Sequence, residues 1–453
     1  MRRQREIPAP EAFCEPEFYA HELAAELMQA RDEGIDLRDC ADLIRAVAAL
    51  APGADREKLA DTVYDRILCA GKIRGYPYRE PSDRDGIFAL CAKGFTDRKP
   101  DARLPARIRG AWYGRIAGCL LGKPLEGIRT DELVPLLRET GNYPMHRWPL
   151  NAEMTDEVAK KYSFPLQGRC YIDNISCAPA DDDTNYTVMA QLIVDKYGRD
   201  FTPDDILSSW IARQPLNAYF TAERVAFVNY IRGYRPPDTA SYKNHYREWI
   251  GAQIRADYFG YINPGRPDLA AEAAWRDASV SHIKNGIYGE MFVAAMLARA
   301  AVSDSAEDVI RCGMAYIPHT SRLYERLSFV LNAYKTGAPS DAVFARIHAE
   351  YDEHTGYGWC HVIPNAMIVT AALLYGEGDY GRSVCLAVQT GFDTDCNGAT
   401  VGSVLGMLLG FDGIGETWIA PLRGKLQTGI AEVGTVEIDR LAEKTAKHAM
   451  QMQ

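Results

Sequence analysis

Four glycines stand four residues apart in the segment 110–122, and this spacing constrains the fold more than any other feature of the sequence. Gly110, Gly114, Gly118 and Gly122 lie on one face of a helix with 3.6 residues per turn. Each glycine inside a helix costs about 1 kcal/mol relative to alanine, so four on one face indicate a steric requirement. The spacing therefore favours a second helix packed very closely against this face.

The residues that follow these glycines exclude a phosphate-binding loop. That loop needs four residues between its glycines and a hydroxyl residue after its lysine, whereas Gly118 and Gly122 enclose three and Pro124 follows Lys123. Glu126 comes just after the expected helix end, where a carboxylate is unfavourable for the helix dipole. We therefore treat Glu126 as a candidate functional acid.

Most of the chain has apolar residues at the three- and four-residue spacing of amphipathic helices. Alternation with a period of two, which is typical of strands, is almost missing, so we expect an all-α fold. Polar stretches at 140–180 and 234–262 are predicted to be long loops suited to a binding site. The predicted helices cover residues 16–31, 38–50, 54–69, 106–122, 184–197, 203–212, 220–232, 267–278, 286–302, 305–312, 320–336, 339–351, 364–376, 381–390 and 397–409.

A weakening of this pattern predicts a domain boundary near residue 103. Between about 71 and 103, Pro77, Pro81 and Pro100 stand among charged residues, as in a connector. We expect a small helical N-terminal extension at 1–103, which packs as a cap on a main domain at 104–453.

Charge and cysteine content exclude several classes of function. The 51 Lys and Arg against 61 Asp and Glu give a net charge of −10, which argues against a nucleic-acid or membrane-surface binder. The 11 cysteines include no C-x-x-C pair, which excludes zinc ribbons and thioredoxin-type sites. No secretory signal or membrane-spanning run is visible, so we expect reduced thiols and a cytoplasmic location.

An acidic cluster, Asp181-Asp182-Asp183-Thr184, precedes the predicted helix that starts at 184. One interpretation is a helix N-terminus, where carboxylates accept hydrogen bonds from unpaired N–H groups. The other is a divalent cation site, because three adjacent carboxylates repel one another and a cap needs only one. Both interpretations stay open on the sequence alone.

A second acidic cluster, in the segment 391–398, stands in the same position before another helix of small residues. Asp393, Asp395 and Asn397 match the start of a calcium-binding EF-hand loop, but its twelfth position holds Val404 instead of glutamate. Two acidic clusters at helix starts therefore remain, and such hard oxygen ligands favour Mg²⁺, Mn²⁺ or Ca²⁺ over zinc or copper.

A polar, glycine-bearing segment at 281–289 is the third candidate region. A lone histidine such as His282 is more often structural than catalytic, although at a helix start it could also bind a polar ligand. Asp257, in the loop 255–265, is a further candidate for ligand contact.

Taken in this order, the segments resemble the ADP-ribosylglycohydrolase family over residues 106 to about 445. The family has a glycine-rich first helix that ends in an acid, as in Gly114–Glu126, and a T-D-D-T metal motif, as in Asp181–Thr184. Its late G-G-D-T-D-T motif is similar to Gly391–Cys396, and its middle histidine and glycine are similar to Ser281–Gly289.

The resemblance implies an all-α helical bundle with two Mg²⁺ ions in a cleft, Mn²⁺ being the alternative ion. Asp181 stands where the family usually has threonine and Cys396 where it has threonine or serine, which changes the set of metal ligands. By resemblance, the predicted catalytic residues are Glu126 and Asp183, the substrate-binding residues are His282, Asn285, Gly286 and Asp257, and the metal ligands are Asp181, Asp182, Asp183, Asp393, Asp395 and Cys396.

The implied function is Mg²⁺-dependent hydrolysis of the glycosidic bond at C1 of the ribose in ADP-ribosylated substrates. One alternative is a hydrolase of a small ribosyl metabolite or nucleoside, with the N-terminal extension and long loops narrowing the cleft. Another is a non-catalytic binding or inhibitor protein on the same fold. The expected partners are an ADP-ribosylated protein or a small ribosyl compound, with no nucleic acid and no membrane.

Overall fold

The computed structural model describes residues 18–92 and 94–451. Over this part of the chain the regular secondary structure is helical, except for one two-stranded antiparallel sheet formed by β1 (Lys425–Gln427) and β2 (Thr435–Glu437). The predicted all-α fold is therefore confirmed. The first two residues of the helix predicted at 16–31 lie outside the described residues. Among the helices within 18–92 and 94–451, none is long and apolar enough to cross a membrane.

The helices fall into a small N-terminal group and a large body. The N-terminal group consists of η2 (Tyr19–Glu22), α2 (Leu23–Asp32), α3 (Ala41–Ala48), α4 (Ala54–Cys69) and α5 (Arg84–Ala89). The body consists of α6 (Leu104–Gly122), η3 (Lys123–Leu125), α7 (Thr130–Glu139), η4 (Asn151–Glu153), α8 (Asp156–Ala159), α9 (Asp182–Tyr197), η5 (Gly198–Asp200), α10 (Pro203–Arg213), η6 (Leu216–Ala218), α11 (Thr221–Ile231), α12 (Asp238–Ser241), η7 (Ile250–Arg255), α13 (Asp257–Tyr261), α14 (Pro267–Ala278), α15 (Lys284–Ala300), α16 (Ala306–Ala315), α17 (Arg322–Lys335), α18 (Ser340–Glu350), α19 (Gly356–Cys360), α20 (Val362–Tyr375), α21 (Tyr380–Gln389), α22 (Thr394–Leu409), η8 (Phe411–Gly413), α23 (Glu416–Ile419), η9 (Ala420–Leu422) and α24 (Ile438–Met450).

The glycine face of α6 packs against α22, as its spacing predicts. A Cβ on Gly118 would lie 2.6 Å from the carbonyl carbon of Gly398, and Gly114 meets Gly402 in the same way. Later residues of α6 face earlier residues of α22, so the two helices are antiparallel. The end of α6 consequently lies beside the start of α22, and Glu126 is brought near the second acidic cluster.

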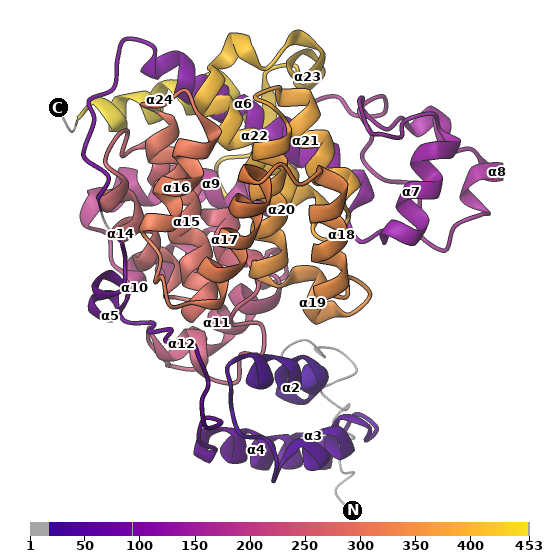
Figure 1. Ribbon diagram of the computed structural model, residues 1–453, viewed down its shortest axis with the longest axis vertical. Helices are drawn as coiled ribbons and strands as arrows, with labels where there is room; N and C mark the ends of the chain where they lie inside the picture. Colours follow the sequence, from indigo (N-terminus) through magenta and orange to yellow (C-terminus); the bar gives the residue numbers. More distant parts are fainter. Residues whose placement is uncertain (1–17, 93, 452–453) are drawn as a thin grey trace, which may run out of the picture.

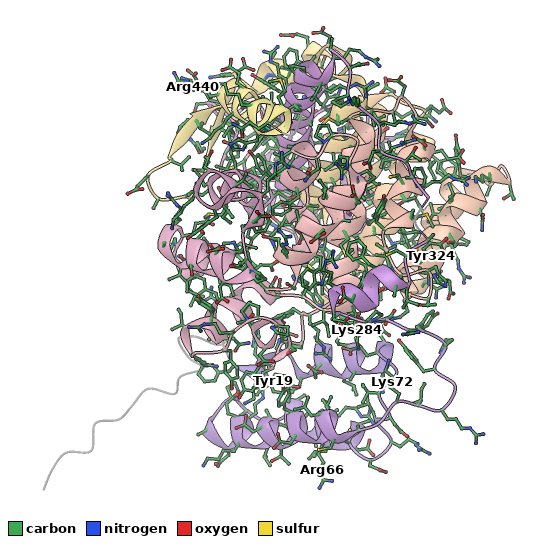
Figure 2. All side chains as sticks on the ribbon, turned by 90° about the vertical axis from the view of Figure 1, so that its left-hand side faces the viewer. Tyr19, Arg66, Lys72, Lys284, Tyr324 and Arg440 are labelled. Atoms are coloured by element: carbon green, nitrogen blue, oxygen red, sulfur yellow. The ribbon has the colours of Figure 1, made fainter. Side chains whose placement is uncertain are left out.

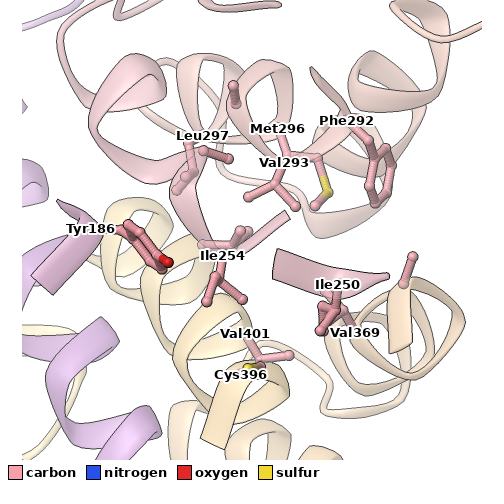
Figure 3. Packing of buried hydrophobic residues seen from close by; sticks show 14 of the residues in the cluster. Tyr186, Ile250, Ile254, Phe292, Val293, Met296, Leu297, Val369, Cys396 and Val401 are labelled. Carbon is pink, nitrogen blue, oxygen red and sulfur yellow. The ribbon is translucent and has the colours of Figure 1, made fainter. Parts of the chain in front are cut away.

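The body is layered around α15, which is buried from Asn285 to Ala300. Figure 1 shows α7 and α8 projecting to one side of the body, while α2, α3 and α4 lie below it. In Figure 3, Ile250 and Ile254 of η7 lie between side chains of α15 and residues Cys396 and Val401 of α22. The segment η7 is thus part of the core.

The expected polar loop at 234–262 is wrong for most of its length. It contains α12, η7 and α13, and nearly every residue from 244 to 262 is buried. The polar composition of this segment predicted an exposed loop, but its charged side chains are buried and paired inside the protein. Arg255 pairs with Glu223 and Asp277, and Asp257 pairs with Arg115. Helices α7 and α24 were also not predicted.

Candidate active site

Three helix ends converge on one cavity of about 390 Å³, a size typical of small-molecule sites. The segment after α6 contributes Glu126, the start of α9 contributes the first acidic cluster, and the start of α22 contributes the second. The cavity is lined by Lys123, Glu126, Ala180, Asp181, Asp182, Asn185, Ala218, Phe220, Thr221, Glu223, Ile250, Gly251, Ile254, Trp359, Cys360, Asp393, Asp395 and Cys396.

Asp181 is the N-cap of α9, so the capping interpretation holds for this member of the first cluster. One of its carboxylate oxygens accepts a hydrogen bond from the backbone N–H of Asp183 at 2.9 Å. The other accepts one from Nζ of Lys123 at 2.5 Å. Both oxygens of Asp181 therefore have protein partners. The sequence analysis used Lys123 only to exclude a phosphate loop and missed this ion pair.

Other carboxylates of the two clusters keep an oxygen available. Within the described residues, Oδ2 of Asp183 and Oδ1 of Asp395 are buried without a hydrogen-bond partner. Oδ1 of Asp183 accepts from Arg115 at 3.0 Å. Ligand atoms of Asp183, Asp395 and Cys396 lie within 4.8 Å of one another, and so do those of Cys119, Asp181 and Asp183. Leaving a buried carboxylate oxygen unpaired is costly, so this arrangement suits a cation.

The electrostatics of the cavity point the same way. Burial raises the pKa of Asp182, Asp183 and Asp393 well above the usual range, and neighbouring carboxylates add to the effect. Burial, followed by the charge of Asp181, raises the pKa of Asp395 to about 6. Arg115 and Lys123 pair with Asp183 and Asp181, whereas Asp182, Asp393 and Asp395 have no ion pair within the described residues.

The pKa of Glu126 is strongly raised. The charge of Asp395 is the main cause and burial the second, and together they raise the pKa of Glu126 to about 9. Burial alone would raise the pKa of Asp181, but the Lys123 ammonium lowers it. Two neighbouring acids thus have opposite tendencies, which is the pattern expected where one carboxyl keeps its proton and another stays charged.

Arg169 holds the backbone around Glu126. Its Nη2 donates to the carbonyl oxygens of Lys123, at 3.2 Å, and Glu126, at 2.9 Å, and its guanidinium lies 4.6 Å from the ring centre of Phe164. This arginine belongs to the predicted 140–180 loop, and no periodicity or motif identifies it in the sequence.

A largely apolar wall completes the cavity. It consists of Ile250, Gly251 and Ile254 from η7 together with Trp359 and Cys360 from α19. Nε1 of Trp359 donates to the carbonyl oxygen of Phe392 at 2.6 Å, directly before Asp393. The sequence analysis did not select any of these five residues, because small and apolar side chains carry no chemical signature.

The remaining predicted site residues lie outside the set that lines the cavity. Asp257 is buried and accepts a hydrogen bond from Arg115 at 2.7 Å. Nδ1 of His282 lies 2.9 Å from the Ser281 hydroxyl, and Asn285 donates to Glu80 and Glu248.

A Cβ on Gly286 would meet the Arg247 carbonyl oxygen. Asp183, which was predicted to be catalytic, is also absent from the cavity lining, although its unpaired oxygen lies near those of the other acids. The substrate-binding roles of His282, Asn285, Gly286 and Asp257 stay predictions without support from this geometry.

Comparison with known proteins gives a family match and a structural similarity. Residues 100–452 match the model of a family described as ADP-ribosylglycohydrolase. The chain is also similar, with 19% sequence identity and a TM-score of 0.48, to a solved structure named "ADP-ribosylglycohydrolase-related protein complex". That similarity covers 77% of this chain and 99% of the other. No curated protein matches the chain.

Proposed function

This chain belongs to the ADP-ribosylglycohydrolase family, and from that premise we propose that it hydrolyses the glycosidic bond at C1 of the ribose in an ADP-ribosylated substrate. The observation that carries the proposal is the convergence of Glu126 with two acidic clusters that keep buried carboxylate oxygens unpaired in the described part of the chain. Helix capping would explain one acidic cluster at the start of a helix. It does not explain why two such clusters lie beside Glu126 in one cavity.

The cavity acids fit a divalent cation. Asp182, Asp183, Asp393 and Asp395 would hold it, because they offer hard oxygen atoms. Of these four, in the described part of the chain, only Asp183 pairs with a protein cation, and its second oxygen stays without a partner. We propose Mg²⁺ in vivo, with Mn²⁺ as an alternative, and two ions as the resemblance implies. A bound divalent cation supplies Lewis-acid polarisation and orients oxygen groups of a substrate.

Glu126 acts as the proton carrier in this proposal. Without a cation, the charge of Asp395 and burial raise the pKa of Glu126 to about 9, and a cation bound to Asp395 would lower it. Glu126 is then placed to exchange a proton with the leaving group or with the water that adds to C1 as the ribose bond breaks. The remaining carboxylates then face a ribose ring on which positive charge develops, and they stabilise that charge. Arg169 keeps Glu126 in place through the backbone.

A panel of substrates tests the proposal. Purified full-length protein, stripped of metal, would be incubated with ADP-ribosyl-arginine, ADP-ribosyl-serine peptides and simple nucleosides, with and without Mg²⁺. Released ADP-ribose or ribose would be quantified by chromatography. We expect Mg²⁺-dependent release, and the compound that turns over identifies the leaving group.

Two variants separate the site from the rest of the protein. Glu126→Gln is expected to abolish release, while Glu157→Gln, at an exposed position on α8, is expected to leave it unchanged. Release that persists in Glu126→Gln would contradict the role of this acid. No release from any compound would contradict the proposed function and favour a non-catalytic binding protein.

A further inference from the structure

The N-terminal extension, residues 18–92, lies outside the family match, which begins at residue 100. Part of it has a hydrophobic core of its own, which runs from Tyr19 to Ile67 and is separate from the core of the body. Figure 1 shows α2 on the side of this group that faces the body, with α3 and α4 beyond it. Helix α2 therefore lies where this group meets the body.

This contact is made largely of buried charges. Arg247 of the body makes a two-pronged ion pair with Glu26, with both distances 2.9 Å, and its Nε donates to Glu33 at 2.7 Å. Lys284 also pairs with Glu33, and Figure 2 shows this lysine where the body meets the extension. Buried ion pairs demand exact geometry to offset their desolvation, so they fix the register of α2 on the body.

One anchor leads from α2 to the η7 part of the apolar wall. Nε2 of Gln29 donates to Oε2 of Glu248 at 2.7 Å, and Arg322 donates to both oxygens of Glu248 at 2.8 Å. The Glu248 carbonyl oxygen accepts from the N–H of Val362 at 3.1 Å. Glu248 thus joins the extension to the turn that precedes Ile250 and Gly251 of η7.

A second anchor leads to the α19 part of the same wall. The hydroxyl of Tyr357 donates to Oδ2 of Asp32, the last residue of α2, at 2.7 Å. Tyr357 is two residues before Trp359, which lines the cavity and contacts the backbone next to Asp393. Helix α19 has only five residues, so its position depends on such contacts more than on its own hydrogen bonds.

Each anchor ends on one of the two segments that form the apolar wall. We propose that the N-terminal extension is a positioning element of the active site, in which Gln29 and Asp32 of α2 hold the wall through Glu248 and Tyr357. In this proposal the extension acts by keeping η7 and α19 where a bound ligand meets them. The choice of ADP-ribose as test ligand rests on the proposed function, whereas the positioning role rests on the contacts.

The test uses three variants of the full-length protein. Tyr357→Phe removes only the hydroxyl that binds Asp32. Gln29→Met removes the amide that binds Glu248 and that also donates to Glu33, four residues along the chain, at 3.0 Å. Lys243→Met is the matched control, because Lys243 pairs with Asp61 of the extension at a site that leads to neither wall segment. ADP-ribose affinity would be measured by calorimetry with Mg²⁺, and hydrogen exchange would be followed for residues 248–254 and 356–360.

We expect both test variants to bind ADP-ribose about tenfold more weakly, to raise KM more than they lower kcat, and to exchange faster in the two wall segments. The control is expected to match the wild type in all three. Unchanged exchange in the wall segments of both test variants would overturn the inference. If the wild type fails to bind ADP-ribose, the proposed function fails instead, and hydrogen exchange still decides the positioning role.

Discussion

Replacing Gly118 with alanine is expected to destabilise the protein, although alanine is the better helix former. A Cβ at this position would lie 2.6 Å from the carbonyl carbon of Gly398 and 3.2 Å from the nitrogen of Ala399. Ordinary contact begins at 3.4 Å. The carbonyl oxygen of Gly398 lies closer still, so α6 and α22 must separate by more than about 0.8 Å, the difference between 3.4 and 2.6 Å, to accept one methyl group.

The size of the effect follows from two opposing contributions. Helix propensity favours alanine by about 1 kcal/mol, whereas overpacking costs about 1–3 kcal/mol and occasionally more. We expect the upper end of that range, because the obstacle is backbone on the facing helix and not a flexible side chain. The net prediction is a loss of about 2 kcal/mol in the free energy of unfolding, roughly a 30-fold change in the unfolding equilibrium.

Urea denaturation followed by tryptophan fluorescence measures this loss. Gly53→Ala is the control, because a Cβ on Gly53 meets nothing within 4 Å and its backbone is extended. The control is expected to change the free energy of unfolding by less than about 0.5 kcal/mol. A Gly118→Ala variant as stable as the wild type, or more stable, would refute the argument that this seam requires glycine.

Three further predictions follow from the cavity and the core. Arg169→Gln is expected to lower kcat by about tenfold or more with little change in cation affinity, because the substitution loosens the backbone that carries Glu126. Steady-state kinetics measures kcat and calorimetry measures cation affinity, and an unchanged kcat would contradict the prediction. Asp395→Asn is expected to weaken Mn²⁺ binding far more than Asp181→Asn does, since both oxygens of Asp181 already have partners. Calorimetric titration measures the Mn²⁺ affinity of each variant, and equal losses of affinity would contradict the prediction. Burial, aided by Arg247, lowers the pKa of His245 to about 3. The stability that the neutral histidine contributes is therefore complete above pH 6.5 and is lost as the pH falls from 6.5 towards 3, by at most roughly 5 kcal/mol. Acid denaturation of His245→Phe should show a weaker pH dependence than the wild type, and an identical profile would refute the assignment.

The elements that sequence analysis predicted well are those with a strong local signal. The glycine spacing predicted the close approach of a second helix, and α22 provides it through Gly398 and Gly402. The helical periodicity predicted the elements that carry the cavity, including α9 and α22. Six of the predicted site residues, namely Glu126, Asp181, Asp182, Asp393, Asp395 and Cys396, line one cavity.

What the sequence concealed depends on contacts between distant segments. Asp257 is polar and lies in a polar stretch, but its partner Arg115 stands 142 residues away, so nothing local shows that the pair is buried. Likewise the Lys123 ion pair with Asp181 and the Arg169 contact with Glu126 depend on how loops fold over the end of α6. Tertiary pairing of this kind has no periodicity, and only the fold displays it.

The N-terminal extension illustrates the same limit. Helices α2, α3 and α4 were predicted from periodicity, whereas α5 lies in the stretch 71–103 that was predicted to be a connector. The boundary near 103 stays a prediction, and the connection of the extension to the cavity runs through single hydrogen bonds. Gln29 reaches Glu248 and Asp32 reaches Tyr357 across more than 200 residues of sequence. Neither pair differs in type from ordinary surface residues.

The most direct test of the central claim is the location of a cation in crystals of the full-length protein soaked with Mn²⁺. Anomalous diffraction at the manganese edge would place any bound ion without reference to activity. We predict a peak at coordination distance from Asp183 and Asp395, lost in Asp395→Asn crystals. A peak confined to other surfaces, or none at the cavity under saturating Mn²⁺, would contradict the claim that these acids form the cation site of a glycohydrolase.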